Sequence, residues 1–264
     1  MHEVRACGAA LLLAFFAVPA PGFDLPEIKS RGSIKVIAAE GVQPEEFAFT
    51  PGSDPGFERE MLEGFARLQH VKLEVVRGKQ WDDRIPALLR GEGDVIVGLT
   101  ETESRRRVIA FTAETIPTRH VVVTHVPHAP VNTVEQLRRE RVGVVISTSW
   151  AQAAVDAGVP DARIETFAEL EPLIEAMKAG RIGATVLSVS DFTLAAKRHP
   201  GLEAGVFLGP LAHQAWGIRK EDQQLAEALN GYIENLRKTS SWSRLVVKYF
   251  GAQALTVLGR AQGH

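Results

Sequence analysis

The sequence contains very little cysteine and no excess of positive charge. Cys7 is the only thiol among 264 residues, and it lies in an N-terminal segment that we expect to be removed. The mature chain would therefore have no thiol for a disulfide, a metal site or a nucleophile. Lysine and arginine number 30 against 32 acidic residues, a formal net charge of -2 at pH 7. Without a global positive field, we do not expect the chain to bind nucleic acid or an anionic membrane surface.

Long apolar runs are also absent beyond the first residues. Arg5 precedes an apolar run over 9–18, and small residues and prolines follow through Gly22, which is the pattern of a secretory signal. The run is too short for the roughly 20 apolar residues of a membrane span. We predict a signal peptide over 1–22, removed after Gly22, and a mature protein that is soluble in the periplasm.

Histidine spacings typical of metal ligands are absent as well. His125 and His128 lie in a proline-containing segment, and His213 stands alone. We therefore expect neither a metal site nor a cofactor. The segment 252–264 carries no clear structural pattern, so we expect a frayed tail there.

Short β-branched runs alternate with helical periodicities along the rest of the chain, which is typical of an α/β protein with largely parallel sheets. The predicted strands are 33–38, 72–76, 94–98, 119–124, 141–146, 184–189 and 215–219. Apolar residues three or four apart predict helices around 57–68 and 170–177, and two further helices over 222–238 and 242–250. Capping-box spacing marks helix starts at Thr133, Ser149 and Thr166.

The segment 81–112 is the most informative for function. It predicts a helix, a glycine turn, a buried strand and a polar loop that opens a second helix. A helix start offers free backbone N–H groups and a positive dipole end, which favour a bound anion. Thr100 and Thr102 add hydroxyls, and Arg105 adds a planar guanidinium suited to a carboxylate. The competing interpretation is that Arg105 is one of three solvated arginines on a helix face.

The chain resembles the family 3 extracellular solute-binding proteins, which are receptors of polar amino-acid uptake systems. The most specific matches are IPALLRGEGDVIVG over 85–98, TETESR over 100–105 and WSRLVVKYFG over 242–251. The resemblance implies that Arg105 and Thr100 bind a ligand carboxylate, that Trp81 stacks on the ligand, and that Thr148 bonds the carboxylate from the opposite side. Of the two hydroxyl residues there, we expect Ser149 to cap the helix and Thr148 to contact the ligand.

The resemblance also implies the fold, a type II periplasmic binding protein with two α/β lobes joined by a two-strand hinge. Lobe one would comprise 33–120 and 213–251, and lobe two 121–212. A monomer of this kind closes around a small carboxylate-bearing ligand, such as an amino acid, and delivers it to the membrane permease of an ABC transporter. Closure would be coupled to binding, because only the closed state brings both sets of donors to the anion.

One departure from the family concerns the ligand's ammonium group. Members usually place an aspartate in lobe two for it, whereas Gly183 and Ser188 stand at the corresponding acidic positions here. Asp191 could substitute, or it could be a helix cap. Glu45, with Glu46 beside it, lies where relatives contact ligand side chains or the ammonium. Phe47 is a further candidate for the cleft wall.

Two other functions remain open at the level of sequence. The segments 182–188 and 199–218 also resemble the solute-binding-like domain of a membrane-bound murein lytic transglycosylase, which would suit a free-standing sensor or accessory domain. The same fold occurs in cyclohexadienyl dehydratases, whose chemistry needs a general acid. Glu101 or Glu103 would be the nominees. We favour a binding protein without catalysis, because no nucleophile is paired with a base.

Overall fold

The computed structural model describes residues 23–261 except 51, 53, 78, 252 and 253. The predicted signal peptide over 1–22 lies outside the described residues. Within the described part of the chain, no helix combines the length and the apolar character needed to cross a membrane.

The first half of the chain alternates short strands with helices. Its elements are α1 (Leu25–Arg31), β1 (Ser33–Ile37), α2 (Phe57–Leu68), β2 (Lys72–Val76), α3 (Arg84–Leu89), β3 (Val95–Thr100), α4 (Glu103–Arg106), β4 (Ala110–Phe111) and β5 (Ile116–His125). The second half continues this alternation and ends in helices. Its elements are α5 (Val134–Leu137), β6 (Val142–Val145), α6 (Ser149–Asp156), a 3-10 turn (Asp161–Arg163), β7 (Ile164–Phe167), α7 (Leu170–Lys178), β8 (Ala184–Ser188), α8 (Val189–Arg198), β9 (Leu202–Ile218), α9 (Gln223–Arg237), α10 (Ser240–Phe250) and α11 (Ala254–Ala261).

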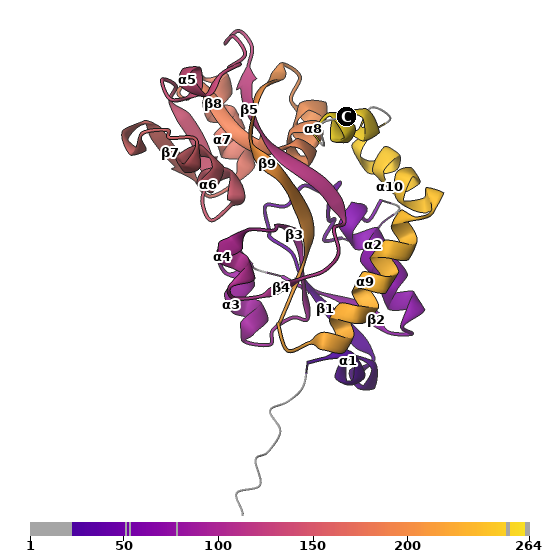
Figure 1. The fold of residues 1–264 in the computed structure, drawn as a ribbon. Helices are drawn as coiled ribbons and strands as arrows, with labels where there is room; N and C mark the ends of the chain where they lie inside the picture. The colour runs from indigo at the N-terminus through magenta and orange to yellow at the C-terminus, as the bar shows by residue number, and fades with distance from the viewer. Residues whose placement is uncertain (1–22, 51, 53, 78, 252–253, 262–264) are drawn as a thin grey trace, which may run out of the picture.

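The strands hydrogen-bond in the order β2-β1-β3-β9-β5-β8-β6-β7, and β4 pairs with β9. Pairing is parallel within β2-β1-β3 and within β8-β6-β7, and antiparallel where β5 and β9 join them. Figure 1 shows β5 and β9 running side by side from one half of the molecule to the other. The predicted fold, two α/β lobes joined by two strands, is therefore confirmed.

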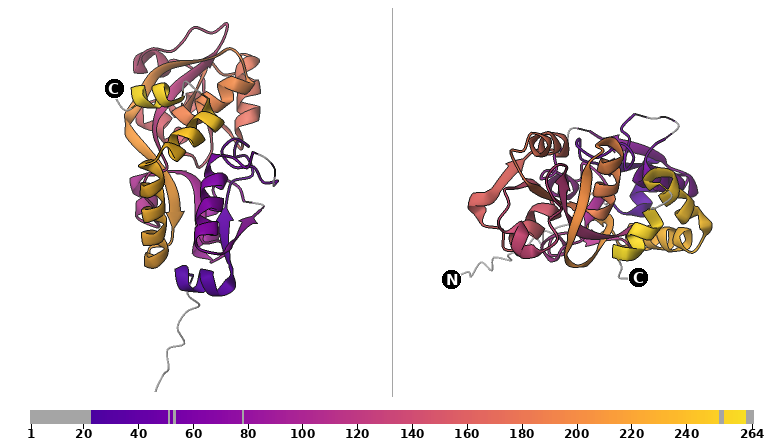
Figure 2. Two further views of the ribbon diagram at one scale, coloured as in Figure 1. Left: turned by 90° about the vertical axis from the view of Figure 1, so that its right-hand side faces the viewer. Right: turned by 90° about the horizontal axis from the view of Figure 1, so that it is seen from above.

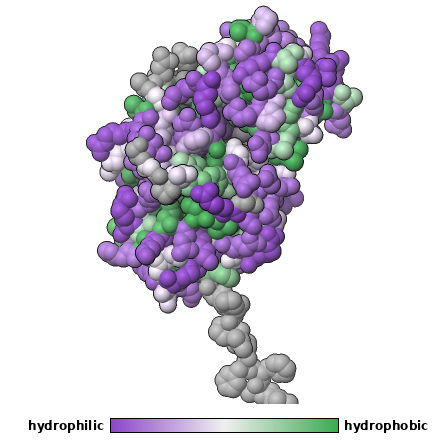
Figure 3. Space-filling view, turned by 180° about the vertical axis from the view of Figure 1, so that it is seen from behind, coloured by the Kyte–Doolittle hydropathy of each residue, from purple (hydrophilic) through white to green (hydrophobic). Residues whose placement is uncertain are grey.

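Lobe one contains β1 to β3, and lobe two contains β6 to β8. In β3 five of six residues are buried, and all five residues of β8 are buried, because helices cover both faces of these central strands. The edge strand β2 is only partly buried. Figure 2 shows the lobes one above the other, and Figure 3 shows that hydrophilic residues cover most of the face opposite to Figure 1, with hydrophobic residues near its middle.

Most of the predicted elements are present, and three predictions were wrong. We missed β7, where the expected cap Thr166 instead lies in the strand, and α7 begins after Glu169. The expected strand 215–219 is the last part of a 17-residue strand, β9. The expected frayed tail contains α11, whose Ala254 and Leu258 are buried, because this helix packs against α8 and β5.

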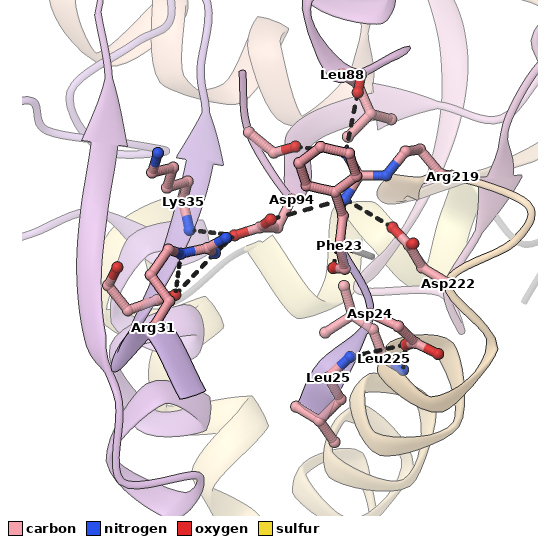
Figure 4. A network of polar contacts seen from close by, with 12 residues as sticks. Phe23, Asp24, Leu25, Arg31, Lys35, Leu88, Asp94, Arg219, Asp222 and Leu225 are labelled. Atoms are coloured by element: carbon pink, nitrogen blue, oxygen red, sulfur yellow. Dashed lines mark hydrogen bonds and ion pairs between the residues drawn. The ribbon is translucent and has the colours of Figure 1, made fainter. Parts of the chain in front are cut away.

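A buried ionic network around Arg219 contacts Phe23, the first described residue (Figure 4). The Arg219 guanidinium is 2% exposed, pairs with Asp222 at 2.8 Å and donates to the carbonyls of Leu88 and Gly93. The ring of Phe23 lies 4.6 Å from the Arg219 guanidinium carbon. The first described residues thus cover the end of β9.

Candidate functional site

A cavity of about 330 Å³, including its open mouth, lies between the two lobes. Its walls come from segments far apart in the sequence: Glu46, Trp81, Arg84, Gly98, Thr100, Arg105, Thr148, Ser149, Trp150, Asp191 and Gln214. Four of these side chains are ionisable acids or guanidinium groups. Gly98 has a φ of 62° where the register of β3 shifts against β9, a conformation that glycine adopts without steric cost.

Arg105 reaches from lobe one to lobe two. Its guanidinium donates to the carbonyl of Thr100 at 2.7 Å and to the carbonyl of Ser147 at 3.2 Å. Ser147 lies in the loop before α6 with a φ of 58°, in the left-handed region, so a strained residue presents this carbonyl. Burial lowers the pKa of Arg105 to about 10, which leaves the guanidinium protonated at neutral pH.

The two arginines that follow Arg105 differ from it. Arg106 and Arg107 have side chains 62% and 73% exposed, and they pair with Glu101 and Glu103. Arg105 forms no ion pair with a carboxylate of the described residues; its guanidinium donates to two backbone carbonyls. The interpretation as three equally solvated arginines therefore does not describe Arg105.

The hydroxyl residues divide between capping and the cavity wall. Thr148 is the N-cap of α6: its oxygen accepts from the Ala151 N–H at 3.3 Å and its hydroxyl donates to the Val145 carbonyl. The expectation that Ser149 is the cap was wrong, because the Ser149 hydroxyl instead bonds the His120 imidazole at 3.0 Å. Thr102 caps α4 by accepting from the Arg105 N–H, and it lines a neighbouring hollow.

Two tryptophans, one from each lobe, meet at the cavity. The ring centroids of Trp81 and Trp150 are 6.0 Å apart with a tilt of 55°. The Arg84 guanidinium carbon lies 4.6 Å from the Trp81 ring centre, on the same lobe. This arrangement suits a flat or apolar ligand part held beside a cation.

Arg84 is a cavity residue that the sequence analysis missed. It is 2% exposed, donates to the Val97 carbonyl at 2.9 Å, and its Nε has no partner among the described residues. Burial, with the nearby Arg105 charge, lowers its pKa to about 9. At the start of a short amphipathic helix, an arginine is usually a solvated residue, so no sequence signal indicated its burial.

Two buried acids form the other charged part of the cavity. Glu46 is 4% exposed and Asp191 is 5% exposed. Burial, and next the Asp191 carboxylate, raises the pKa of Glu46 well above its ordinary value. Burial raises the pKa of Asp191 to about 6, and hydrogen bonds from Ser188 and Gln43 oppose that rise.

Ser188, Glu45 and Phe47, all expected at the site, lie elsewhere. Ser188 is the N-cap of α8 and donates to the Asp191 carboxylate, so it positions that acid rather than lining the cavity. Glu45 lies outside the cavity wall and pairs with Arg198 at 3.7 Å. Phe47 is 1% exposed and packs edge-on against Phe49 in the core. Residues 44–46 form a turn in which Glu46 is buried and Glu45 is only half-buried.

Among the described residues, no group of three or more histidine, cysteine, aspartate or glutamate side chains is arranged to hold a metal ion. The polar groups of the cavity wall include the guanidinium groups of Arg84 and Arg105, the carboxyl groups of Glu46 and Asp191, and the amide of Gln214.

The sequence profile of the bacterial extracellular solute-binding proteins, family 3, matches residues 34–252. A probable histidine-binding protein of Neisseria gonorrhoeae is 24% identical over 95% of this chain and 96% of its own length. Among solved structures, a mutant of ArgBP from T. maritima superposes with a TM-score of 0.76 and 28% identity, covering 86% of this chain and 98% of that one. The ancestral amino acid-binding protein AncCDT-1, a precursor of cyclohexadienyl dehydratase, gives a TM-score of 0.77 and 26% identity, covering 86% and 99%.

A second group of relatives is longer than this chain. The membrane-bound lytic murein transglycosylase F of Stutzerimonas stutzeri is 24% identical over 86% of this chain but only 48% of its own length. The chain thus spans about half the length of these curated relatives.

Proposed function

Because the chain belongs to the bacterial extracellular solute-binding proteins of family 3, we propose that it captures a small carboxylate-bearing ligand between its lobes for an ABC transporter permease, outside the cytoplasm. The observation that carries the proposal is Arg105, a protonated guanidinium at the cavity that has no carboxylate partner among the described residues. A guanidinium binds a carboxylate through two parallel hydrogen bonds.

Groups from both lobes would bind the anion. Arg105 and Thr100 line the cavity from lobe one, and Ser149 and Trp150 line it from the first turn of α6. Backbone N–H groups in the first turn of a helix have no partner within the helix, so they are available to an anion. A ligand that bonds both lobes stabilises the closed state over the open one by the difference in its affinities.

Members of the family usually bind the ligand's ammonium through an acid at the position of Ser188. In this chain Asp191 would bind the ammonium instead. It lines the same cavity from the first turn of α8 and carries a pKa of about 6, so it is largely ionised at neutral pH. The Ser188 hydroxyl and the Gln43 amide both donate to it, which holds the carboxylate in one orientation. The ligand would then carry both a carboxylate and an ammonium, as an amino acid does.

A ligand-sensing or accessory role is the alternative. The observation that favours it is the likeness to the transglycosylase F proteins, which this chain matches over about half of their length. Both roles need the same cavity, and co-purification would separate them. A permease recovered with the tagged chain supports transport, and a cell-wall enzyme recovered in its place supports the alternative.

A dehydratase-like enzyme is the third role, and the residues nominated for it do not support it. Glu101 pairs with Arg106 and does not line the cavity, and the Glu103 side chain is 83% exposed. Incubation with prephenate or arogenate tests this role directly, because the appearance of an aromatic product would establish catalysis.

The binding proposal is tested by thermal shift with a panel of small acids and amino acids. A ligand that binds only the folded state raises the melting temperature, and we expect at least one carboxylate to do so. Arg105→Ala should remove that shift, because the carboxylate loses its bidentate donor.

Arg106→Ala is the matched control for this test, since Arg106 is on the same helix and its side chain is 62% exposed. The control should retain the wild-type shift. A shift that survives Arg105→Ala, or the absence of a shift with every carboxylate, contradicts the proposal.

A further inference from the structure

A single carboxylate on the ligand would account for only one of the two guanidinium groups at the cavity. Arg84 lines the same walls as Arg105 and is more deeply buried, at 2% exposure. One terminal nitrogen of Arg84 donates to the Val97 carbonyl, and its Nε is buried without a partner among the described residues. Its hydrogen bond is to a backbone carbonyl, and the nearby Glu46 carboxyl group acts on it only through charge, opposing the fall of its pKa. Donor capacity at Arg84 is thus left for a ligand.

Arg84 is charged despite its burial. Burial lowers its pKa to about 9, so the guanidinium stays protonated at pH 7. The face of Trp81 stabilises the cation in part, at 4.6 Å from the guanidinium carbon. Even so, a buried cation is costly, and an anion placed beside it offsets part of that cost.

The two acids of the cavity do not cancel the two cations. Glu46 and Asp191 repel each other, and burial disfavours a second negative charge between them. Burial disfavours a charge on Glu46, whereas hydrogen bonds from Ser188 and Gln43 stabilise the charged form of Asp191. The cavity wall thus brings together two guanidinium groups and one carboxylate whose charged form is hydrogen-bonded.

We infer that the ligand is a dicarboxylic amino acid, with Arg105 binding the α-carboxylate, Asp191 the ammonium and Arg84 the second carboxylate. This inference rests on the proposed carboxylate-binding function and goes beyond it. Such a ligand offers one carboxylate to each of the two guanidinium groups and an ammonium to Asp191, all of which line one cavity.

Isothermal titration calorimetry of the wild-type chain with matched ligand pairs tests this assignment. L-glutamate and L-glutamine have nearly the same size and differ in the charge of the side-chain group, as do L-aspartate and L-asparagine. We expect the better of the two acids to bind at least tenfold more tightly than its amide. An amide that binds as tightly as its acid in both pairs overturns the inference.

Arg84→Met assigns the preference to Arg84. Methionine retains an unbranched apolar chain against Trp81 and removes the charge, so the ratio of acid to amide affinity should fall to about one. Arg90→Met is the matched control, because the Arg90 side chain is 52% exposed and pairs with Asp83 and Glu92 outside the cavity. An Arg84→Met protein that is folded by circular dichroism and keeps the wild-type ratio overturns the assignment. If Arg84→Met does not fold, the assignment is decided by the wild-type ratio and by Arg84→Lys. Lysine keeps the positive charge, so this variant should retain the preference for the acid over its amide.

Failure of this inference differs from failure of the proposed function. Arg105-dependent binding of glutamine or another neutral amino acid, without any preference for the acids, refutes the dicarboxylic ligand and leaves carboxylate capture standing. Absence of Arg105-dependent binding for every carboxylate refutes both.

Discussion

Glu58 is a buried carboxylic acid in the first turn of α2, outside the cavity wall. It is 2% exposed and accepts hydrogen bonds from the Trp216 indole and the Thr115 hydroxyl. Burial raises its pKa from 4.5 to about 7, and those two hydrogen bonds only partly oppose the rise. The folded chain therefore holds a proton on Glu58 that the unfolded chain releases at a lower pH.

This difference makes the stability of the fold depend on pH. Between about pH 4.5 and 7 the folded state binds more protons than the unfolded state at this residue, so the free energy of unfolding falls as pH rises through that window. The loss is on the order of 3 kcal/mol, from about 1.36 kcal/mol per pKa unit. Above about pH 7 the contribution is constant.

Glu58→Gln should remove this loss, because the amide cannot ionise and its oxygen can still accept from Trp216. We expect the variant to be more stable than the wild type at pH 8 and to differ much less at pH 4.5, measured by urea unfolding across pH. Glu63→Gln, on the same helix but with a half-buried side chain, should leave the wild-type profile unchanged. A Glu58→Gln profile parallel to that of the wild type contradicts the prediction.

At single positions, sequence patterns predicted the cavity unevenly. Arg105, Thr100, Trp81 and Thr148 were predicted and all line the cavity; their roles in binding stay predictions. Adjacent residues were harder to separate, because capping spacing is satisfied by either of two neighbouring hydroxyls. For this reason the helix cap was predicted at Ser149 but lies at Thr148. Similarly, Glu46 rather than Glu45 or Phe47 lines the cavity.

At the scale of elements, the start of the described chain is tied to a helix about 200 residues later. The Asp24 carboxylate accepts from the Leu25 N–H at 2.8 Å, at the start of α1, and from the Leu225 N–H at 2.7 Å, in the first turn of α9. Its second oxygen accepts from the Gln224 N–H at 3.1 Å. One side chain therefore satisfies the first turns of two helices.

Asp24→Ala should destabilise the fold by more than a single cap does. Loss of one N-cap costs about 1 kcal/mol, within a range of about 0.5–2 kcal/mol, so we expect about 2 kcal/mol here, measured by urea unfolding. Glu27→Ala, an exposed change in the same helix, is the control and should be nearly neutral. A cost for Asp24→Ala no larger than that of the control refutes the double cap.

Elements with strong periodicity were predicted well, and weak ones were not. The capping box at Thr133, the helix α9 and the end of α10 at Gly251 agree with the sequence, because local hydrogen bonds and apolar spacing determine them. In contrast, β7 is only four residues long, and just one of them is buried. The first part of β9 is a strand because it pairs with β5, a partner that local sequence does not identify.

At the scale of the whole molecule, Gln43 joins the two lobes near the cavity. Its amide donates to the Asp191 carbonyl at 3.2 Å and to the Asp191 carboxylate at 3.3 Å, and its oxygen accepts from Arg198. Gln43 belongs to lobe one, and both partners belong to α8 of lobe two. These bonds exist only when the lobes are together.

Gln43→Ala should shift the chain toward an open arrangement, because it removes stabilisation from the closed state alone. We expect a larger radius of gyration in small-angle X-ray scattering than for the wild type, with little change in the free energy of unfolding. Gln152→Ala, which changes an exposed hydrogen bond within α6, should scatter as the wild type does. Equal radii for Gln43→Ala and the wild type would refute the role of Gln43 in closure.

The sequence by itself determined the α/β alternation, the two-lobe fold and the candidate binding residue Arg105. Periodicity, helix caps and a family pattern are properties of neighbouring residues, so the sequence alone reveals them. Only the tertiary structure decided which charges share the cavity. Arg84, Glu46 and Asp191 come from three distant segments, and each alone is an ordinary charged residue of a turn or helix. Their burial against one another follows from lobe packing, and that shared burial gives the cavity its charge and its expected ligand.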